Sequence, residues 1–397
     1  MEEASPAAEI SLRALAGIGE VERAAWDALA NPPGEPQNPF LSWDFLEALE
    51  AAGCAGARTG WAPRHLVLSG PDGIAGALPC YLKSHSQGEY VFDYGWADAF
   101  ERAGGRYYPK LQVSIPFTPV TGRRLLVEPG PKAQENRQLL VAGLAELRRQ
   151  LDVSSAHATF VTGTEAEELS KLGFLIRNDQ QFHFQSEGYG DFGDFLAALA
   201  SRKRKAIRKE RREALSAGIS VQWLTGDAIT EADWDAFFAF YMDTGARKWG
   251  RPYLNRRFFS LIGERMADKI LLILARRDGR TIAGALNFIG SDTLYGRYWG
   301  CLEEHPYLHF EICYYQAIEF ALAHGLARVE AGAQGEHKLA RGYRPVTTYS
   351  AHLIAEPGFR RAVADYLERE RRHVAWEGRM LAEHAPFRKA EGCDRND

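Results

Sequence analysis

The pentapeptide Ile74-Ala-Gly-Ala-Leu78 recurs as Ile282-Ala-Gly-Ala-Leu286, and each copy follows an Asp-Gly pair, Asp72-Gly73 and Asp278-Gly279. An apolar run precedes each pair and another follows it, which is the pattern of a β-hairpin. An aromatic stretch then follows each hairpin, and we expect both stretches to be strands, at 90–94 and from residue 295. Small residues are common here, so the pentapeptide alone is compatible with coincidence. The matched turns, the matched flanks and an offset near half the chain favour a tandem duplication.

Length and composition fit a soluble protein of two domains. The 397 residues are 46% apolar and 25% charged, with a net charge of only −4. This balance argues against disorder and against a global positive field that would recruit nucleic acid. The five cysteines contain no Cys-x-x-Cys pair, so neither a disulfide framework nor a thiolate zinc site is expected. An acidic N-terminus, and the lack of an apolar run of about 18 residues, predict a cytoplasmic protein with at most peripheral membrane contact.

Both halves show the same order of patterns: strand, two helices, hairpin, strand, helix, strand. This order predicts an α/β (α+β) fold with helices packed on a mixed sheet. We expect an N-terminal domain at 1–187, a second domain at 188–356, and a C-terminal helix and tail at 357–397, where apolar residues recur at helical spacing. The stretch 96–122 follows neither periodicity and is interpreted as a functional insertion. Further expected helices are 21–29, 43–52, 136–151, 164–172, 231–244, 255–266 and 308–324, and further strands are 158–161, 219–224 and 327–330.

Five strings along the chain carry a resemblance to a known family. They are Tyr107-Tyr-Pro-Lys-Leu-Gln-Val-Ser-Ile-Pro-Phe-Thr-Pro-Val-Thr-Gly122, Ser201-Arg-Lys-Arg-Lys-Ala-Ile-Arg-Lys-Glu-Arg211, Trp249-Gly-Arg-Pro-Tyr253, His309-Phe-Glu-Ile-Cys-Tyr-Tyr315 and Gly332-Ala-Gln-Gly-Glu-His-Lys-Leu-Ala-Arg-Gly-Tyr343. In this order they resemble the FemAB-like N-acyltransferases, chiefly the branch described as peptidoglycan biosynthesis or recognition proteins. The resemblance implies two tandem GNAT-like acyl-CoA N-acyltransferase domains in a bacterial enzyme of the cell envelope.

Acyl transfer to an amine needs a neutral nucleophile, a base for its proton, donors for the oxyanion and a leaving group. GNAT-fold enzymes usually bind the pyrophosphate of acyl-CoA at a motif of Arg or Gln, two residues, Gly, one residue, then Gly or Ala, and this chain has no convincing copy. The donor therefore stays open between an aminoacyl-tRNA, as the resemblance to Fem enzymes implies, and an acyl-CoA bound in another way. No permanently bound cofactor is expected. The motifs of P-loop NTPases, serine hydrolases and zinc proteases are also missing from the sequence.

The segment 202–212 contains eight basic side chains and one acidic side chain, within a predicted helix at 201–215. A phosphate-bearing ligand is the natural partner of such a charge, and tRNA, CoA and a lipid head group all qualify. The alternative is a solvated helix face, although basic residues on every side of the helix fit that explanation poorly. The cations expected to bind the donor are Arg202, Lys203, Arg204, Lys205 and Arg208.

The predicted helix at 308–324 places Glu311, Tyr315 and Glu319 on one stripe, four residues apart. Much of the helix is apolar, so a carboxylate beside tyrosines can be buried there, with a raised pKa that suits a general base. We select Glu311 as a candidate base and Tyr315 as a substrate-binding residue. The alternatives are an exposed polar stripe and, for Glu311, a favourable interaction with the helix dipole. No metal site is expected, because Pro306 interrupts the run of potential ligands.

The segment 332–343 follows a short predicted strand and mixes three glycines with polar and charged residues. Such a loop can bring backbone N–H groups close to a ligand. The resemblance to Fem enzymes implies a lysine at the reaction centre, ahead of an aromatic-glycine turn, and Lys338 is the matching position. His337 is an alternative base near neutral pH, although a lone histidine is more often structural. Three further residues of the segment are expected to bind substrate: Gln334, Arg341 and Tyr343.

A second candidate region lies in the first half, where Tyr107, Tyr108 and Lys110 precede the proline-stiffened stretch 116–119, which includes Thr118. An apolar stretch beside a cation suits an acceptor with an apolar or glycan-peptide body and a negative head, although an ordinary packed loop explains it almost as well. Trp249 and Tyr253, from one of the strings that carry the resemblance, complete the expected substrate-binding residues.

The favoured function is an N-acyltransferase that moves an activated acyl or aminoacyl group onto an amine of a cell-envelope precursor. Its expected partners are that donor and acceptor, with tRNA as a possible donor and the inner membrane as a possible peripheral contact. One alternative is long-chain acylation of an amino-lipid such as a sphingoid base, as in ceramide formation. Another, of a different class, is a recognition module without catalysis. The sequence does not determine the oligomeric state.

Overall fold

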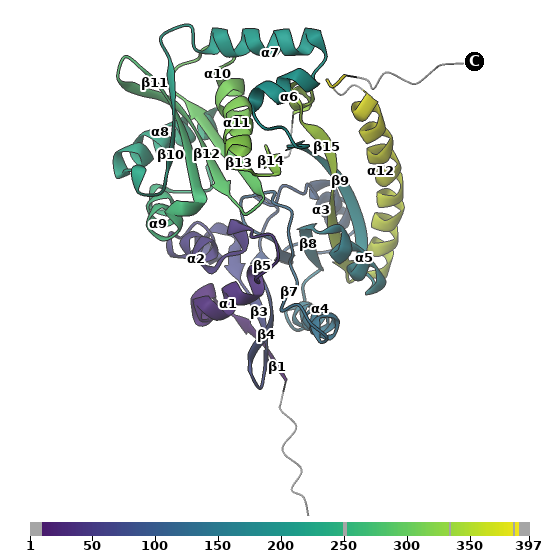
Figure 1. The fold of residues 1–397 in the computed structure, drawn as a ribbon. Coiled ribbons are helices and arrows are strands. Elements are labelled where there is room, and N and C mark those ends of the chain that lie inside the picture. Colours follow the sequence, from purple (N-terminus) through teal and green to yellow (C-terminus); the bar gives the residue numbers. More distant parts are fainter. Residues whose placement is uncertain (1–9, 249–251, 333–334, 384–385, 389–397) are drawn as a thin grey trace, which may run out of the picture. The chain divides into compact units, whose positions relative to one another are not determined.

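The structure is a computed structural model that describes residues 10–248, 252–332, 335–383 and 386–388. The chain forms two compact units that alternate along the sequence (Figure 1). Unit 1 comprises 1–179, 253–266 and 347–374, and unit 2 comprises 180–252, 267–346 and 375–397. The domain boundaries predicted at 187 and 356 stay a prediction, because a compact unit need not coincide with a duplicated stretch of sequence.

Unit 1 contains a small antiparallel sheet in the order β1-β3-β4-β7, formed by Ser11–Leu15, His65–Gly70, Gly73–Leu78 and Leu126–Val127. The first copy of the pentapeptide lies in β4, and Gly70 pairs with Gly73 across the predicted hairpin. Gly73 has φ +121°, a conformation that favours glycine. Helices α1 (Arg23–Ala30) and α4 (Ala133–Gln150) pack against this sheet. The first hairpin is therefore confirmed.

The larger sheet contributes to unit 1 the strands β15, β8, β6, β5 and β2, in that order: Arg344–Ile354, Ser155–Val161, Lys110–Val113, Cys80–Lys83 and Trp61–Pro63. Neighbours are antiparallel, except that β6 and β8 are parallel. Apolar side chains of β6, β8 and α4 form a core, which includes Val113, Ala158 and Leu140. The other helices here are α2 (Trp43–Ala51), α5 (Gly163–Lys171) and α9 (Arg256–Met266).

The aromatic stretch at 90–94 is not a strand, and this prediction was wrong. Tyr90 has φ +59°, which is incompatible with an extended strand, and helix α3 begins at Tyr94 and ends at Arg102. The hydroxyl of Tyr107 and the ammonium of Lys110 both donate to the Asp93 carboxylate, so the stretch is folded inward as a polar loop. The supposed insertion at 96–122 accordingly contains most of α3 and all of β6.

Unit 2 contains the order β10-β11-β12-β13-β14-β9, formed by Ser220–Thr225, Ile270–Arg277, Arg280–Ile289, Thr293–Cys301, Arg328–Glu330 and Leu175–Gln185. β9 enters from unit 1, and only β13 and β14 are parallel. The second hairpin joins β11 to β12 through Asp278 and Gly279, which have φ +50° and +76°, as a type I′ turn requires. The second aromatic stretch is β13, as predicted.

The helices of unit 2 are α6 (Phe192–Ala198), α7 (Ser201–Ala214), α8 (Glu231–Lys248), α10 (Leu308–Phe310) and α11 (Gln316–Ala323). Helix α8 packs directly on β13, where the Cβ of any residue replacing Gly300 would lie 2.2 Å from the Phe240 carbonyl oxygen. Between α10 and α11 the turn Glu311–Tyr315 is π-helical. The predicted C-terminal helix is confirmed as α12 (Pro357–Glu383), which buries Val363 and Leu367.

A buried histidine pair in unit 1 makes stability depend on acid. The Nδ1 atoms of His157 on β8 and His352 on β15 lie 2.7 Å apart. Burial lowers the pKa of His157 to about 3, and burial also holds the pKa of His352 well below its usual value. An unfolded histidine binds its proton near pH 6.5, so between about pH 6.5 and pH 3 the unfolded state binds more protons and the free energy of unfolding falls as pH falls.

We therefore expect the urea midpoint of the wild type to fall between pH 7 and about pH 4.5, and to fall less in His157→Gln. Gln binds no proton in either state, so at this position the unfolded state gains no advantage as the pH falls. Equal losses in the two proteins would contradict this account, and unfolding at pH 7 serves as the control for any general damage by the substitution.

Candidate active site

Lys338 lies in unit 2 on the 3-10 helix Glu336–Arg341, which follows β14. Gly335 and Gly342 flank this helix with φ +113° and +90°, so both ends use conformations that favour glycine. Lys338 is only 2% exposed, and its Nζ donates to the Gly332 carbonyl oxygen at 3.0 Å. Burial lowers the pKa of Lys338 to about 8, with a smaller upward contribution from Cys313 and a downward one from Arg297. The ammonium form of Lys338 therefore dominates at pH 7, and the side chain loses its proton at a pH only slightly higher.

A β-bulge places Arg297 near Lys338. Leu286 pairs with Tyr298 and Asn287 pairs with Gly296, so Arg297 is the extra residue on β13. Bulges redirect a side chain and are frequent beside active sites. The Arg297 side chain is 2% exposed, and its Nη2 donates to Glu330 Oε2 at 3.1 Å.

His183 on β9 completes this group. Its Nε2 lies 3.9 Å from Glu330 Oε1 and 3.2 Å from Gln181 Oε1, and burial lowers its pKa. None of Arg297, Glu330 and His183 was expected from the sequence. They come from three separate strands, and the bulge leaves no motif in the sequence, so no local signal could have identified them.

His337 lies on the same 3-10 helix as Lys338 and forms a second group with Tyr314. The Tyr314 hydroxyl and His337 Nε2 are 2.8 Å apart, and the His337 side chain is exposed, whereas Tyr314 is buried. Tyr314 belongs to the π-helical turn Glu311–Tyr315. Single π-helical turns within α-helices occur frequently at functional sites. An exposed imidazole next to a buried lysine is compatible with the base role predicted for His337, which stays a prediction.

Glu311 is fully buried and ion-paired. Arg211 of α7 donates to it from Nε at 3.1 Å and from Nη2 at 2.9 Å, and Gln316 Nε2 donates at 2.7 Å. Arg211 also contacts Glu319 at 2.6 Å. Burial matches the expectation for Glu311, and the partly buried Arg211 guanidinium is its ion-pair partner. Its base role remains a prediction that a variant can test.

A second set of contacts joins α7 to the 3-10 helix Glu336–Arg341, which carries Lys338. Glu210 accepts from the Tyr315 hydroxyl and, at 3.0 Å, from Arg341 Nη2. The Arg341 guanidinium lies 3.4 Å from the centre of the Phe310 ring. Tyr343 is fully buried, and its hydroxyl has no hydrogen-bond partner among the described residues. Three of the predicted substrate-binding residues, Tyr315, Arg341 and Tyr343, therefore lie in this part of unit 2, and Gln334 lies outside the described residues.

Helix α7 separates its charges by face, unlike the uniform distribution that the sequence suggested. Ile207, Glu210, Arg211 and Ala214 face the body of unit 2. Arg202, Lys205 and Arg208 are exposed, and Lys203 and Arg204 are half-buried. Over the residues that the structure describes, none of the five predicted phosphate-binding cations has a carboxylate partner, and the first turn of the helix contains no acidic residue. Cations near a helix N-terminus oppose its dipole, so an external anion would relieve the unfavourable charge.

The first-half candidates lie in unit 1, and there Lys110 is not a free cation. Lys110 Nζ donates to Glu89 Oε2 at 2.8 Å, to Ser86 Oγ at 2.8 Å and to Asp93 Oδ2 at 2.5 Å, and the residue is fully buried. Tyr108 and Ser86 hydroxyls are 2.8 Å apart. Lys110 thus presents no uncompensated charge to a ligand, and the binding role of this group stays a prediction.

Two further substrate-binding candidates, Thr118 and Tyr253, lie beside Phe117 in unit 1. Thr118 is buried, and Tyr253 stacks on the Phe117 ring with centroids 5.0 Å apart. Phe117 has φ +62°, an uncommon conformation for an aromatic residue. Trp249 falls outside the described residues, so its predicted role has no structural counterpart here.

The model of the FemAB-like family, described as peptidoglycan biosynthesis/recognition, matches residues 17–389. The chain belongs to this family. The family predicted from the five sequence strings is confirmed. No match was found among curated protein sequences.

Several solved structures are similar to this FemAB-like chain. FemX has 12% identity and a TM-score of 0.55, over 87% of this chain and 98% of that one. A protein of unknown function from Bacteroides thetaiotaomicron has 13% identity and a TM-score of 0.52, over 86% and 100%. A tandem GNAT protein of clavulanic acid biosynthesis has 15% identity and a TM-score of 0.46, over 88% and 99%. The family match and the likeness to FemX confirm the predicted α/β fold of tandem GNAT-like domains.

No helix in the described ranges has both the length and the apolar character needed to cross a membrane. Likewise, no group of three or more His, Cys, Asp or Glu side chains within those ranges is arranged to hold a metal ion.

Proposed function

We propose that this FemAB-like protein is an N-acyltransferase that moves an activated acyl or aminoacyl group onto an amine of a cell-envelope precursor, with the reaction centred on Lys338. The observation that carries this proposal is the burial of a lysine with a pKa of about 8 in a glycine-flanked loop. Membership of the FemAB-like family supports the reaction class. The fold by itself supports only the architecture, because one fold hosts many functions.

The chemistry assigned to Lys338 is stabilisation of negative charge. Attack of an amine on an activated carbonyl places that charge on the carbonyl oxygen, and a fixed ammonium in a dry site stabilises it more than water does. Below pH 8 Lys338 carries the required proton. The attacking amine must also lose a proton, for which His337 is the exposed candidate base and Glu311 the buried one.

The donor is either an acyl-CoA or an aminoacyl-tRNA, and we assign its phosphates to the unpaired cations of α7. The acceptor amine belongs to a precursor met in the cytoplasm or at the inner face of the membrane. Tyr315, Arg341 and Tyr343 are proposed to line the reaction centre, and Tyr107, Tyr108, Lys110, Thr118 and Tyr253 to serve the acceptor.

Turnover with a panel of donors and amines tests the function. Purified protein is incubated with acyl-CoAs of increasing chain length and with charged tRNA, and release of thiol or free tRNA is followed for each amine. We expect amine-dependent release from one donor class, abolished by omission of the amine. Tight binding of a donor and an envelope precursor without any release would instead support the recognition module.

Replacement of three α7 cations should weaken donor binding. In Arg204→Ala/Lys205→Ala/Arg208→Ala, we expect lower affinity at low salt. For a tRNA donor the salt dependence should be flatter by roughly two to three units, because each lost phosphate contact contributes about 0.7 on a single strand and about 0.9 on a duplex. The effect on acyl-CoA should be smaller, since it has few phosphates. The measurement is donor affinity against salt concentration.

A matched control removes the same charge elsewhere. Arg58, Lys132 and Lys171 are exposed residues of unit 1 outside α7, and their triple Ala variant should bind the donor like the wild type. Unchanged affinity of the α7 variant at low ionic strength would remove phosphate binding from this helix.

A further inference from the structure

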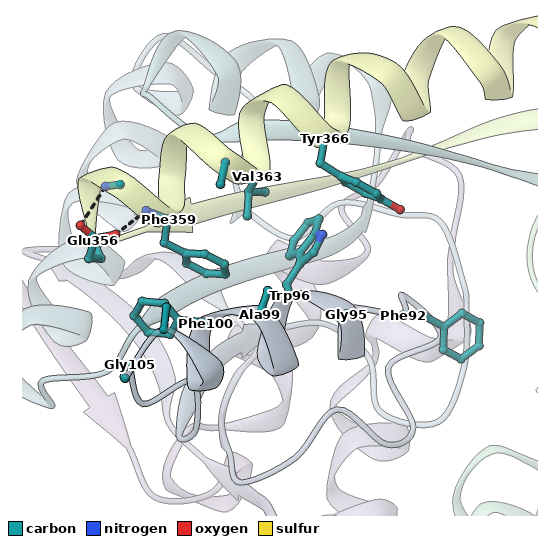
Figure 2. Close-up of a pocket in the computed structure, with 14 residues that line it drawn as sticks. Phe92, Gly95, Trp96, Ala99, Phe100, Gly105, Glu356, Phe359, Val363 and Tyr366 are labelled. Atoms are coloured by element: carbon teal, nitrogen blue, oxygen red, sulfur yellow. Dashed lines mark hydrogen bonds between the residues drawn. The ribbon is translucent and has the colours of Figure 1, made fainter.

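An apolar groove in unit 1 lies between helix α3 and the first turns of α12, and encloses about 820 Å³ (Figure 2). Ligand pockets typically enclose roughly 300–1,000 Å³. Trp96 and Phe100 from α3 face Phe359 and Val363 from α12 across the groove. The Phe100 and Phe359 rings stack with centroids 4.4 Å apart. The groove has no part in the reaction proposed above, and its residues belong to neither group of site candidates.

A single charged side chain lines the groove, at one of its ends. Glu356 is the one charged side chain among the 14 residues that line it, and its carboxylate accepts from the backbone N–H groups of Gly358 and Phe359. At the other end the Tyr366 hydroxyl donates to Glu370, and Glu370 pairs with Arg177 at 2.7 Å. A ligand in the groove therefore meets mainly carbon atoms, with the Glu356 carboxylate at one end. Such a lining is complementary to an uncharged hydrocarbon and unsuited to a peptide, whose backbone groups would lose their hydrogen bonds to water.

Small residues keep the groove open and give it a narrow, extended form. A Cβ added at Gly95 would meet no atom within 4 Å, and Ala99 and Ala362 also line the groove. Helix α3 has 9 residues, so at 1.5 Å per residue the groove follows it for roughly 13 Å. Phe92 and Tyr366 at one end are 51% and 41% exposed. Large apolar side chains left exposed together mark binding surfaces.

We propose that this groove binds the alkyl chain of a single-chain lipid, with the polar head outside in solvent. The chain lies along α3 beside the aromatic rings, and burial of its methylene groups supplies the affinity. Because the lining is apolar apart from the Glu356 carboxylate at one end, recognition depends mainly on chain length.

Equilibrium dialysis of the full-length protein tests the proposal, with hexanoate, octanoate, decanoate and laurate below their micelle-forming concentrations. We expect saturable binding whose affinity rises about fourfold per methylene until the groove is filled. Decyltrimethylammonium, with the same tail as decanoate and the opposite charge, should bind with similar affinity. No saturable binding of laurate, or a preference above about tenfold for one head charge, would overturn the proposal.

Two variants fill the groove from different positions, and a third is the control. Ala99→Trp and Gly95→Leu should weaken laurate binding by at least about tenfold, because the new side chains occupy the space of several methylene groups. Asp98→Trp places the same bulky residue at an exposed position of α3 that does not line the groove, and should bind laurate normally. Thermal unfolding verifies that each variant folds.

Unchanged laurate affinity in both filled variants would place the lipid elsewhere and overturn the assignment. A dimer in lipid-free sedimentation experiments that Ala99→Trp abolishes would also overturn it, and would assign the groove to a second copy of the chain. Failure of these binding tests would leave the turnover tests of Lys338 unaffected, because the residues concerned are different.

Discussion

Lys338→Ala should lower the rate of acyl transfer about 10²- to 10³-fold, the loss found when one donor to an oxyanion is removed from an enzyme. The ammonium is buried and donates to the Gly332 carbonyl, and the nearby Arg297 guanidinium is already paired with Glu330. The measurement is single-turnover release of thiol or tRNA from the donor that the panel identifies. Lys338→Met keeps the buried volume and should show the same loss, which separates charge from packing.

The pH profile checks the same assignment. Because burial lowers the pKa of Lys338 to about 8, the protonated form is lost as pH rises through 8, and the wild-type rate should fall there. Lys338→Arg keeps a charge to much higher pH, so whatever activity it retains should lack this fall. Normal folding with near-full activity in Lys338→Ala would contradict the site, and the group around Tyr107 and Lys110 would then be the next candidate.

Glu311→Gln should lower the free energy of unfolding by about 2 to 3 kcal/mol. The substitution removes a fully buried carboxylate from Arg211, which then keeps only the partly exposed Glu319 as an anionic partner. A broken buried ion pair costs more than this when no second partner exists, and Glu319 reduces the loss. Urea unfolding measures it, and Glu319→Gln is the control, with an expected loss below about 1 kcal/mol because Glu319 is 38% exposed.

The same variant decides between the two roles of Glu311. If Glu311 serves as the ion-pair partner of Arg211, activity falls only as stability does, and the acidic limb of the pH profile remains. If it is the general base, Glu311→Gln abolishes that limb and lowers turnover more than Lys338→Ala does, and by more than the loss of stability accounts for. The second result would contradict our expectation.

Local sequence patterns predicted most of the helices and strands, because turn conformation and helical propensity depend on neighbouring residues. The Asp278-Gly279 pair predicted a hairpin since both residues adopt positive φ in a type I′ turn, and the basic segment formed the predicted helix as α7. The stretch at 90–94 shows the limit of such patterns. Its aromatic residues favour a strand, but bonds from Tyr107 and Lys110 to Asp93 hold it as a loop, and those partners are distant in sequence.

In the candidate site, some features follow from the sequence and others depend on the tertiary structure. Lys338, its flanking glycines and the family follow from the sequence, because a motif of consecutive residues carries them. Its lowered pKa depends on burial, and the nearby Arg297, Glu330 and His183 are brought together by a bulge and by strands far apart in the chain.

Helix α7 shows most clearly which properties belong to the sequence and which depend on packing. Its sequence determined a helix with an excess of positive charge, because charge and helical propensity belong to the residues themselves. Only the tertiary structure decided that Arg211 neutralises Glu311 whereas Arg202, Lys205 and Arg208 remain exposed, because the face that a helix buries is set by its packing partners.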